Sequence, residues 1–357
     1  MQGIRLRFLA LALCLPLAAP LSAQQAVELK QVGLSKWGIG SADYSGIAPL
    51  GDNRYAVVSD KGPADGFFLF RIDQSATTGE VVSVYLEEFR ANPSPQLDAA
   101  GNYVRDGEGI AYFPSAGTVF ISGEGDQEIL EYAMSGQLTG RRLNVPAIFG
   151  RQNIVANYGF EALTYSPETH RFWTTTESTL PRDGQAAGPQ HPAAQNLLRL
   201  LSFGDDLQPA AQYAYRMDRG KKDDFGRTYV YGVPALTALP DGRLLVLERE
   251  ADISNGYLSS QVVCKIFLVD PSQGWQIDSS TELSALDPNR FLVKTLVAHF
   301  TTKFTPFNQS FANYEGMCLG RKLTDGRQTV LLINDSQSGY GKGPFRLKDY
   351  VKVIILP

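Results

Sequence analysis

The sequence predicts an all-β fold, a β-propeller of four-stranded antiparallel blades, and three observations indicate it. Five segments repeat one design: a small residue, a short apolar run, a turn rich in Pro, Gly, Asp or Asn, and a second apolar run that ends in an acid. A third apolar run follows each segment, and no long amphipathic helix is recognisable in the series. Antiparallel units repeated in this way are typical of propellers.

Each repeated segment reads as a β-hairpin. The segments lie at 44–62, 107–125, 159–178, 232–250 and 314–337. Their turns, LGDN, FPSAG, SPETH, LPDG and LTDG, have the composition of short hairpin connections. Five blades can be counted, and the irregular spacing leaves room for a sixth, degenerate blade. A β-sandwich is the alternative, but it does not require the same hairpin with the same terminal acid five times.

The remaining strands complete the blades. Third strands are expected at 67–73, 128–134, 197–203, 264–270 and 350–356, and outer strands at 82–89, 141–146, 211–217 and 291–300. The last repeat has no outer strand of its own. The segment AVELKQVGL at 26–34 could supply it, which would close the ring.

The first residues have the pattern of a secretory signal peptide. Arg5 and Arg7 precede a short apolar run at 8–17, and Ala23 is a plausible cleavage point. We therefore expect 1–23 to be removed, 24–357 to form a single propeller domain, and the mature protein to be periplasmic or secreted. The apolar run is short and broken by prolines, so no membrane span is expected in the mature protein. Cys264 and Cys318 remain in it, either paired or as buried thiols.

The repeated acids predict a ring of carboxylates. Because an antiparallel hairpin places the start of one strand beside the end of the next, Glu108 should lie near Glu124. The same argument pairs Glu161 with Glu177 and Glu315 with Asp335. Asp60, Asp106 and Glu248 extend the set. If the first strand of each blade lines the central channel, these acids converge on one mouth.

The ring admits two interpretations, a structural network of ion pairs or a divalent-cation site. Oxygen ligands with few His or Cys residues favour Ca²⁺. The candidate metal ligands are Asp106, Glu108, Glu161, Glu248, Glu315 and Asp335.

Long loops are expected on the same face as the acids. They lie at 93–106, 178–195, 218–229 and 336–349. Insertions on one face of a repeat protein usually mark its binding face. The candidate substrate-binding cations of this face are Lys61, Arg105, Lys221, Lys222 and Arg249. They suit a small anionic ester, whereas the net charge of -4 gives no sign of a nucleic-acid partner. A monomer is expected.

Four stretches resemble the phytase-like domain family known as "esterase-like activity of phytase". They are RDGEGIAYFPS, NYGFEALTYSPETHRFWTTTES, VPALTALPDGRLLVLERE and NYEGMCLGRKLTDGRQTVLLINDSQ. The resemblance covers roughly residues 40 to 355 and implies an exported bacterial propeller that hydrolyses esters. Ser45 and Pro234 stand where other repeats have Glu108, Glu161 and Glu315, so the predicted ring is incomplete.

Three functional hypotheses follow. The first is an exported, metal-dependent hydrolase of phosphate esters, in which Ca²⁺ positions a water and Glu124 or Glu177 acts as general base. The second is a non-catalytic propeller that binds a carbohydrate, a peptide or an envelope protein. The third is a lactonase-like hydrolase. The chain has no G-x-S-x-G, P-loop or H-E-x-x-H motif that would indicate other chemistry.

Overall fold

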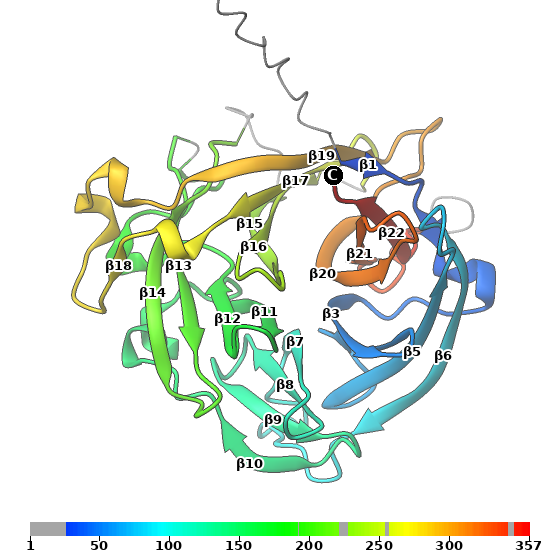
Figure 1. Cartoon of the computed structure of the whole chain (residues 1–357), viewed down its shortest axis with the longest axis horizontal. Helices are drawn as coiled ribbons and strands as arrows, with labels where there is room; N and C mark the ends of the chain where they lie inside the picture. Colours follow the sequence, from blue (N-terminus) through cyan, green and yellow to red (C-terminus); the bar gives the residue numbers. More distant parts are fainter. Residues whose placement is uncertain (1–25, 192, 221–227, 254–256, 342–345) are drawn as a thin grey trace, which may run out of the picture.

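The computed structural model describes residues 26–191, 193–220, 228–253, 257–341 and 346–357. These residues form a ring of five antiparallel sheets around a central axis, a five-bladed β-propeller (Figure 1). The prediction of an all-β propeller is confirmed, and the count is five rather than six. The expected signal peptide at 1–23 lies outside the described residues.

The first three blades follow in chain order. The first contains β3 (Tyr44–Gly51), β4 (Arg54–Ser59), β5 (Gly66–Gln74) and β6 (Val81–Ala91). The second contains β7 (Gly107–Phe113), β8 (Thr118–Gly123), β9 (Ile129–Ala133) and β10 (Leu138–Arg142). The third contains β11 (Phe160–Ser166), β12 (Arg171–Thr176), β13 (Leu197–Phe203) and β14 (Pro209–Arg216), with β18 (Gln276–Ile277) added to its outer edge.

The last two blades complete the ring. The fourth contains β15 (Thr228–Ala238), β16 (Leu244–Ile253), β17 (Gln261–Val269) and β19 (Lys294–Lys303). The fifth contains β20 (Asn313–Lys322), β21 (Gln328–Asp335) and β22 (Tyr350–Ile355), and β1 (Val27–Glu28) and β2 (Val32–Gly33) pair with β22. The segment at 26–34 therefore closes the ring as predicted, since its strands precede β3 in the chain.

Helical structure within the described residues is limited to short 3₁₀ turns. These are η1 (Leu34–Trp37), η2 (Ala147–Phe149), η3 (Arg151–Asn153), η4 (Pro181–Asp183), η5 (Pro271–Gln273), η6 (Leu283–Ala285) and η7 (Pro288–Arg290). In this part of the chain, no helix has the length and apolar character needed to cross a membrane.

One outer strand begins earlier than expected. β10 starts at Leu138, whereas the sequence pattern placed the strand at 141–146. Gly136, at φ +92°, makes a tight turn in which the Ala133 amide donates to the Gln137 carbonyl, so the chain reverses directly after β9. Pro146 has no amide hydrogen for a sheet ladder.

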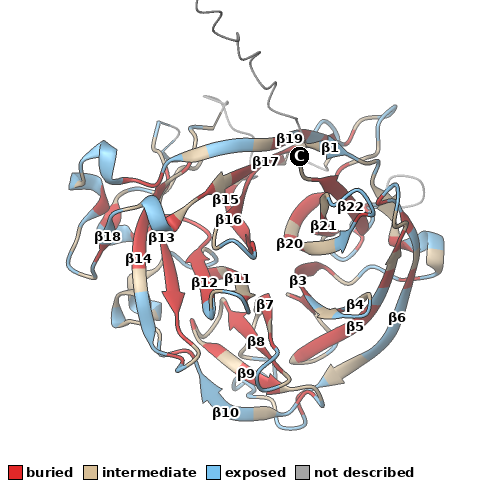
Figure 2. Cartoon of the chain, in the orientation of Figure 1, coloured by how far each residue is buried: buried red, intermediate tan, exposed pale blue. Residues whose placement is uncertain are grey.

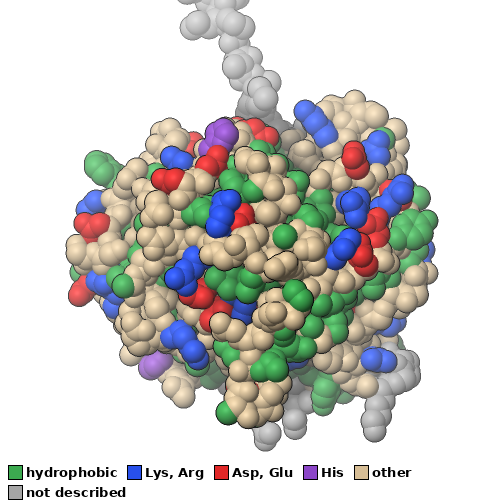
Figure 3. Space-filling view, turned by 90° about the horizontal axis from the view of Figure 1, so that it is seen from below, with side chains coloured by type: hydrophobic (Ala, Val, Ile, Leu, Met, Phe, Trp, Pro, Cys, Tyr) green, Lys and Arg blue, Asp and Glu red, His purple; other side chains and the backbone are tan. Residues whose placement is uncertain are grey.

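The apolar core lies between neighbouring blades. Buried residues follow the inner and middle strands, while β6, β10 and β19 expose much of their length (Figure 2). The outer side of the molecule visible in Figure 3 carries basic and acidic side chains side by side. Cys264 and Cys318 are both buried and are free thiols, which settles the alternative left open by the sequence.

Candidate functional site

A β-bulge occurs at the same place in every blade. The register between the first two strands shifts just after Tyr44, Gly107, Phe160, Gly232 and Tyr314. The residues at the shifts include Ser45, Glu108, Glu161, Pro234 and Glu315. A bulge leaves one residue out of the ladder and redirects its side chain. Three blades therefore present an acid at the bulge of the strand nearest the axis.

The innermost strands pack closely below these acids. An added Cβ on Gly46 would lie 2.4 Å from the carbonyl oxygen of Glu108, and one on Gly109 would lie 2.1 Å from that of Glu161. Each glycine thus lets the neighbouring blade approach its backbone. The cavity between these innermost strands has a volume of about 10 Å³, which is close to the minimum that holds one water molecule. The acids therefore form the rim of a nearly closed channel.

The second strands supply the other acids of the rim. At the end of the second strand of four blades, an acid lies opposite the start of the first strand of the same blade. These equivalent acids are Asp60, Glu124, Glu177 and Asp335. Their charges act on one another across the blades: Glu108 is influenced by Asp60, Glu124 and Glu315, and Glu161 by Glu108, Glu177 and Glu315. We call Asp43, Asp60, Asp106, Glu108, Glu124, Glu161, Glu177, Glu315 and Asp335 the acid ring.

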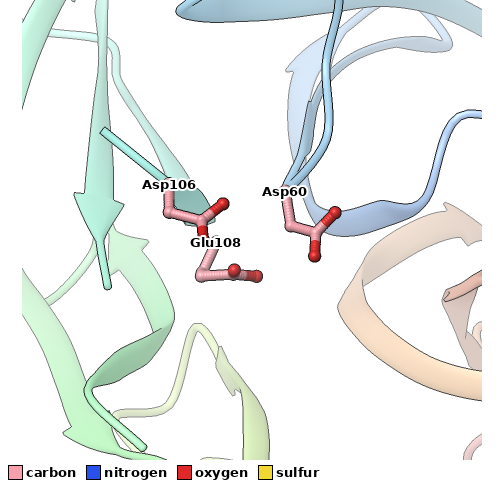
Figure 4. A group of neighbouring side chains, drawn as sticks. All are labelled: Asp60, Asp106 and Glu108. Carbon is pink, nitrogen blue, oxygen red and sulfur yellow. The ribbon is translucent and has the colours of Figure 1, made fainter. Parts of the chain in front are cut away.

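Asp60, Asp106 and Glu108 form the tightest group in the ring. One carboxylate oxygen from each lies within 4.8 Å of the others, although Asp60 follows β4 of the first blade and Asp106 and Glu108 belong to the second (Figure 4). Burial raises the pKa of Asp106 to about 6, with a smaller effect from the charge of Asp60. Burial, followed by the charge of Asp106, raises the pKa of Glu108 well above its usual value. We call these three residues the acid trio.

The trio fits the requirements of a calcium ion. Ca²⁺ takes oxygen ligands at about 2.3–2.6 Å, so oxygens on opposite sides of one ion lie roughly 5 Å apart. The oxygens of the trio are spaced accordingly. Oδ1 of Asp60 is buried and has no hydrogen-bond partner within the described residues. A divalent cation would satisfy this atom and would favour the ionised carboxylates against the burial and mutual repulsion that raise their pKa values.

Glu124 lies beside the trio on the second blade. Its Oε1 accepts a hydrogen bond of 3.2 Å from the amide of Gly159, the residue before β11. Burial raises the pKa of Glu124 to about 7, and the charges of Glu177, Asp106 and Asp60 add to the effect. A carboxylate that titrates near neutral pH is suited to general acid–base catalysis. Glu124 was predicted as a catalytic residue, and this role stays a prediction.

Arg249 braces the opposite side of the ring. Its guanidinium contacts Glu177 and lies 2.8 Å from Glu315 Oε1 and 2.7 Å from Asn313 Oδ1. The side chains of Arg249 and Glu177 are 4 % and 2 % exposed. Glu177 is therefore held in a buried ion pair rather than left available to abstract a proton. Arg249, predicted as a substrate-binding cation, is engaged in the same pair.

Glu248 lies outside the acid ring. The register pairs Gly232 with Arg249, so Arg249 holds the position equivalent to Glu124 and Glu177. Neighbouring residues of a strand point to opposite faces, and Glu248 therefore faces the space between the third and fourth blades. There it accepts hydrogen bonds from Tyr215 (2.7 Å) and Lys294 (2.5 Å). The structure does not bring this candidate ligand to the other acids.

The sequence of the chain matches a known protein family over most of its length. The family model described as "Phytase-like: Esterase-like activity of phytase" matches residues 39–337. The chain belongs to this phytase-like family. The match includes every member of the acid ring and both glycines of the close approach. No protein in the curated set matches the chain.

Solved structures similar to this phytase-like chain include three enzymes. An endo-arabinase from Bacteroides thetaiotaomicron is 11% identical, with 91% of this chain and 96% of that chain covered and a TM-score of 0.46. An α-L-arabinanase from Penicillium chrysogenum is 12% identical, with 92% and 98% covered and a TM-score of 0.41. A gluconolactonase from Xanthomonas campestris is 12% identical, with 95% and 97% covered and a TM-score of 0.36.

A pocket of about 290 Å³ adjoins the trio in the phytase-like chain. It lies between the first and second blades and is lined by Asp60, Lys61, Tyr103, Arg105 and Asp106, among others. The Lys61 ammonium is 3.2 Å from Asp60, and its side chain is 59% exposed. Lys61 can therefore reach a ligand in this pocket.

The other candidate cations are placed differently. Arg105 is 5% exposed, and its Nη1 lies 2.6 Å from Asp126, so its charge is already balanced. Lys221 and Lys222 lie outside the described residues.

Two further acids of the mouth were missed in the sequence. Asp43 immediately precedes β3 and accepts hydrogen bonds from the amide and hydroxyl of Ser338. Burial acts to raise the pKa of Asp43, but the hydrogen bonds outweigh it, and the pKa lies below its usual value. Asp349 precedes β22, and burial raises its pKa to about 7. Asp43 immediately precedes the first repeat and lies opposite Asp60 across the hairpin. Its position one residue before the repeat was the signal in the sequence that could have identified it as an acid of the mouth.

Asp335 joins this second group of acids. Burial, followed by the charge of Glu315 and a hydrogen bond with Asp43, raises its pKa well above the usual value. Its carboxylate also accepts hydrogen bonds from the amide and side chain of Gln337. Asp335, a predicted metal ligand, therefore lies beside Asp43 rather than in the trio.

Proposed function

We propose that this chain is an exported, calcium-dependent hydrolase of phosphate esters and that the acid ring is its active site. The observation that carries the proposal is the acid trio, with the unpartnered Oδ1 of Asp60, next to Glu124. Membership of a family described by esterase-like activity supports a hydrolytic role. The propeller fold alone would not support a hydrolytic role, since propellers serve many functions.

In this proposal, Asp60, Asp106 and Glu108 hold the calcium ion. The ion would supply positive charge for the phosphoryl oxygens and lower the pKa of a bound water. Glu161 and Glu315 face the same mouth, but Arg249 holds Glu315 from the other side. Of the predicted metal ligands we therefore retain Asp106 and Glu108, and Asp60, which was not among them, completes the set.

The chain's own residues supply the remaining steps. Glu124, when ionised, accepts the proton of the attacking water and then returns it to the leaving alcohol. Lys61 binds a phosphoryl oxygen at the edge of the pocket. Arg249 keeps Glu177 and Glu315 in place, which fixes the electrostatic surroundings of Glu124. Water is excluded from below because the innermost strands close the channel.

The proposal also includes the destination of the protein. The basic and apolar pattern of 1–23 supports export, and the mature protein would act as a monomer in the periplasm or outside the cell. The phosphate ester would therefore be one that occurs in that compartment.

The Arg249 network favours one alternative, a non-catalytic binding propeller. Buried ion pairs of this kind are found in proteins in which acids serve structure alone. In that case the acids would brace the blades, and a carbohydrate, peptide or envelope protein would bind the surrounding loops.

One experiment separates the two. The mature protein is titrated with Ca²⁺ by calorimetry, and hydrolysis of p-nitrophenyl phosphate and of a δ-lactone is followed with and without chelator. Glu108→Gln is compared with Glu168→Gln, whose carboxylate is exposed and outside the ring. We expect saturable Ca²⁺ binding and chelator-sensitive phosphatase activity, both lost in Glu108→Gln alone.

Four outcomes would contradict the proposal in whole or in part. Calcium-independent turnover, or full activity in a folded Glu108→Gln protein, would remove the metal site. Absence of both Ca²⁺ binding and turnover would leave the structural interpretation of the ring. Turnover of the lactone but not of the phosphate ester would change the substrate class.

A further inference from the structure

A long insertion distinguishes the fourth blade from the first three. Residues 270–293 connect its third strand, β17, to its outer strand, β19, whereas the corresponding connections of the first three blades span only 75–80, 134–137 and 204–208. Within the insertion, β18 pairs with β14 of the third blade, so the insertion crosses from one blade to the next (Figure 1). Insertions in a repeat protein tend to carry function, because the repeating core does not need them.

Buried contacts hold the insertion on the third blade. Arg199 of β13 forms an ion pair of 2.6 Å with Asp183, and both side chains are 1% exposed. The Arg199 guanidinium also donates a hydrogen bond of 3.0 Å to the carbonyl oxygen of Asp278, and Asp183 accepts one of 3.1 Å from the amide of Leu283. Leu283 packs in an apolar cluster with Ala214 of β14. Because a buried ion pair is broken only at a high cost, a segment anchored in this way has a fixed shape.

The anchored insertion forms one side of a cavity of about 380 Å³. Trp275, Gln273 and Asn289 of the insertion line it, together with Arg243 of the turn between β15 and β16. This volume falls in the range of about 300–1,000 Å³ that is usual for small-molecule sites. Arg243 directly precedes β16, and Arg249 of the brace lies six residues further along, which is roughly 20 Å of extended strand. The cavity is therefore separate from the acid ring.

Trp275 is the distinctive side chain of this cavity. It lies between η5 and β18 and is 63% exposed, although tryptophan is highly buried in most proteins. The guanidinium carbon of Arg290 lies over the indole, 5.7 Å from the centre of the ring. Arg290 is itself fixed by η7, in which its amide donates a hydrogen bond of 2.9 Å to the carbonyl oxygen of Asp287. The indole is thus held in place while much of its surface stays open.

The lining of the cavity has no net charge. Its charged side chains are Arg243 and Asp270, which have opposite signs. Nη2 of Arg243 already lies 2.6 Å from Oδ2 of Asp241. Gln273 and Asn289 add uncharged amide groups, each of which can both donate and accept hydrogen bonds. An open aromatic ring with neutral polar groups around it suits an uncharged ligand that has an apolar face and several hydroxyl groups.

We propose that this cavity binds a neutral carbohydrate, with a pyranose ring stacked on Trp275 and its hydroxyl groups bonded to Gln273 and Asn289. A pyranose has C–H groups on its faces and hydroxyl groups around its edge, which match a flat indole flanked by amides. A charged ligand would gain little, because the charges of the lining balance. Since the cavity and the acid ring lie apart, carbohydrate binding is independent of the proposed hydrolase function.

Affinity electrophoresis tests the site with defined polysaccharides. The mature protein is run in native gels that contain hydroxyethylcellulose, xyloglucan, galactomannan or pullulan, and a gel with polygalacturonate provides the acidic comparison. We expect at least one of the neutral polysaccharides to retard the protein in a concentration-dependent way, which gives a dissociation constant. Retardation by polygalacturonate alone, or by none of these polymers, would overturn the proposal.

Variants of exposed side chains provide the matched controls. Trp275→Ala should weaken binding roughly tenfold or more, as is typical of a central aromatic contact, whereas Trp275→Tyr keeps a stacking ring and should retain most of the affinity. Asn289→Ala should weaken binding by a smaller factor. Tyr85→Ala removes a ring that is 56% exposed on β6 and should have no effect. Unchanged binding in a folded Trp275→Ala protein, or an equal loss in Tyr85→Ala, would reject the site.

Binding and hydrolysis should separate in two further variants. Trp275→Ala should hydrolyse p-nitrophenyl phosphate at the unaltered rate, and Glu108→Gln should keep its affinity for the polysaccharide. Binding without any turnover would retain the carbohydrate site and reject the hydrolase, and turnover without binding would do the reverse. Loss of polysaccharide binding in a folded Glu108→Gln protein would place the sugar at the acid ring and overturn the assignment to the cavity.

Discussion

Nη1 of Arg249 lies 2.8 Å from Oε1 of Glu315, and the same guanidinium contacts Glu177. One side chain of the fourth blade therefore joins acids of the third and fifth blades across the mouth of the channel. The buried guanidinium stays charged, because the neighbouring carboxylates raise its pKa despite the opposing effect of burial. Arg249 thus braces Glu177 and Glu315, whereas no described arginine bridges the trio and Glu124 in the same way.

Removal of the brace should destabilise the propeller. Arg249→Met leaves Glu177 and Glu315 without their buried partner, and we expect a loss of about 3–5 kcal/mol of unfolding free energy in urea titrations. Adding Glu177→Gln should recover part of the loss. Arg327→Met, which breaks the exposed pair with Asp325, should leave the urea midpoint nearly unchanged, because solvent screens the pair. Equal effects of Arg249→Met and Arg327→Met would argue against the brace.

Glu124 should determine the pH dependence of activity. In the metal-free protein the pKa of Glu124 is raised to about 7, and Ca²⁺ bound in the trio would lower it. We expect kcat to rise with pH as Glu124 ionises, over a range below that of the metal-free group, and Glu124→Gln to reduce kcat by about 10²–10⁴-fold while Ca²⁺ affinity is retained. The comparison is with Glu168→Gln, which should leave the pH profile unchanged. A profile that is unaltered in Glu124→Gln would assign the base to another residue.

The close approach of the blades should depend on Gly109. A methyl group at this position would meet the carbonyl oxygen of Glu161 at 2.1 Å. We expect Gly109→Ala to reduce the unfolding free energy by about 1–3 kcal/mol, in the range of overpacked cores. Gly40→Ala is the matched control because no atom lies within 4 Å of its added methyl group. Thermal and urea unfolding would report both variants, and similar stabilities would contradict the close packing.

Stability of the metal-free protein should fall as pH rises toward neutrality. Burial raises the folded-state pKa of Asp106 to about 6 and of Glu124 to about 7, above their unfolded values. Such groups favour the folded state when protonated, and this contribution is lost between about pH 4 and pH 7 as they ionise. Melting in chelator should therefore show a lower midpoint at pH 8 than at pH 5. Ca²⁺ should restore the midpoint at pH 8. A midpoint that is flat or rises across this range would contradict the prediction.

Much of the fold was contained in local sequence patterns. The hairpin of Glu108 and Glu124 was recognisable because two apolar runs flank a tight turn, and such a hairpin brings its ends together whatever surrounds it. The ring closure through 26–34 followed from a blade that lacked an outer strand. β10 was misplaced by three residues because the Gly136 turn is shorter than the apolar pattern suggested.

The side on which each ring residue points was decided by tertiary structure. Glu248 was assigned to the ring and Arg249 to substrate binding, yet the register of β15 and β16 directs Arg249 to the mouth and Glu248 away from it. A shift of one residue reverses the face of every side chain in a strand, and an apolar pattern does not fix that shift beside a bulge.

The sequence by itself determined the repeating hairpins, the acids at their ends and the family, because these depend on neighbours along the chain. Tertiary structure alone brought Asp60 of the first blade to Asp106 and Glu108 of the second. It also placed Asp43 beside Asp335, and the amide of Gly159 of the third blade against Glu124 of the second. These contacts cross from blade to blade, and their geometry is set by how the packed cores hold the sheets around the axis.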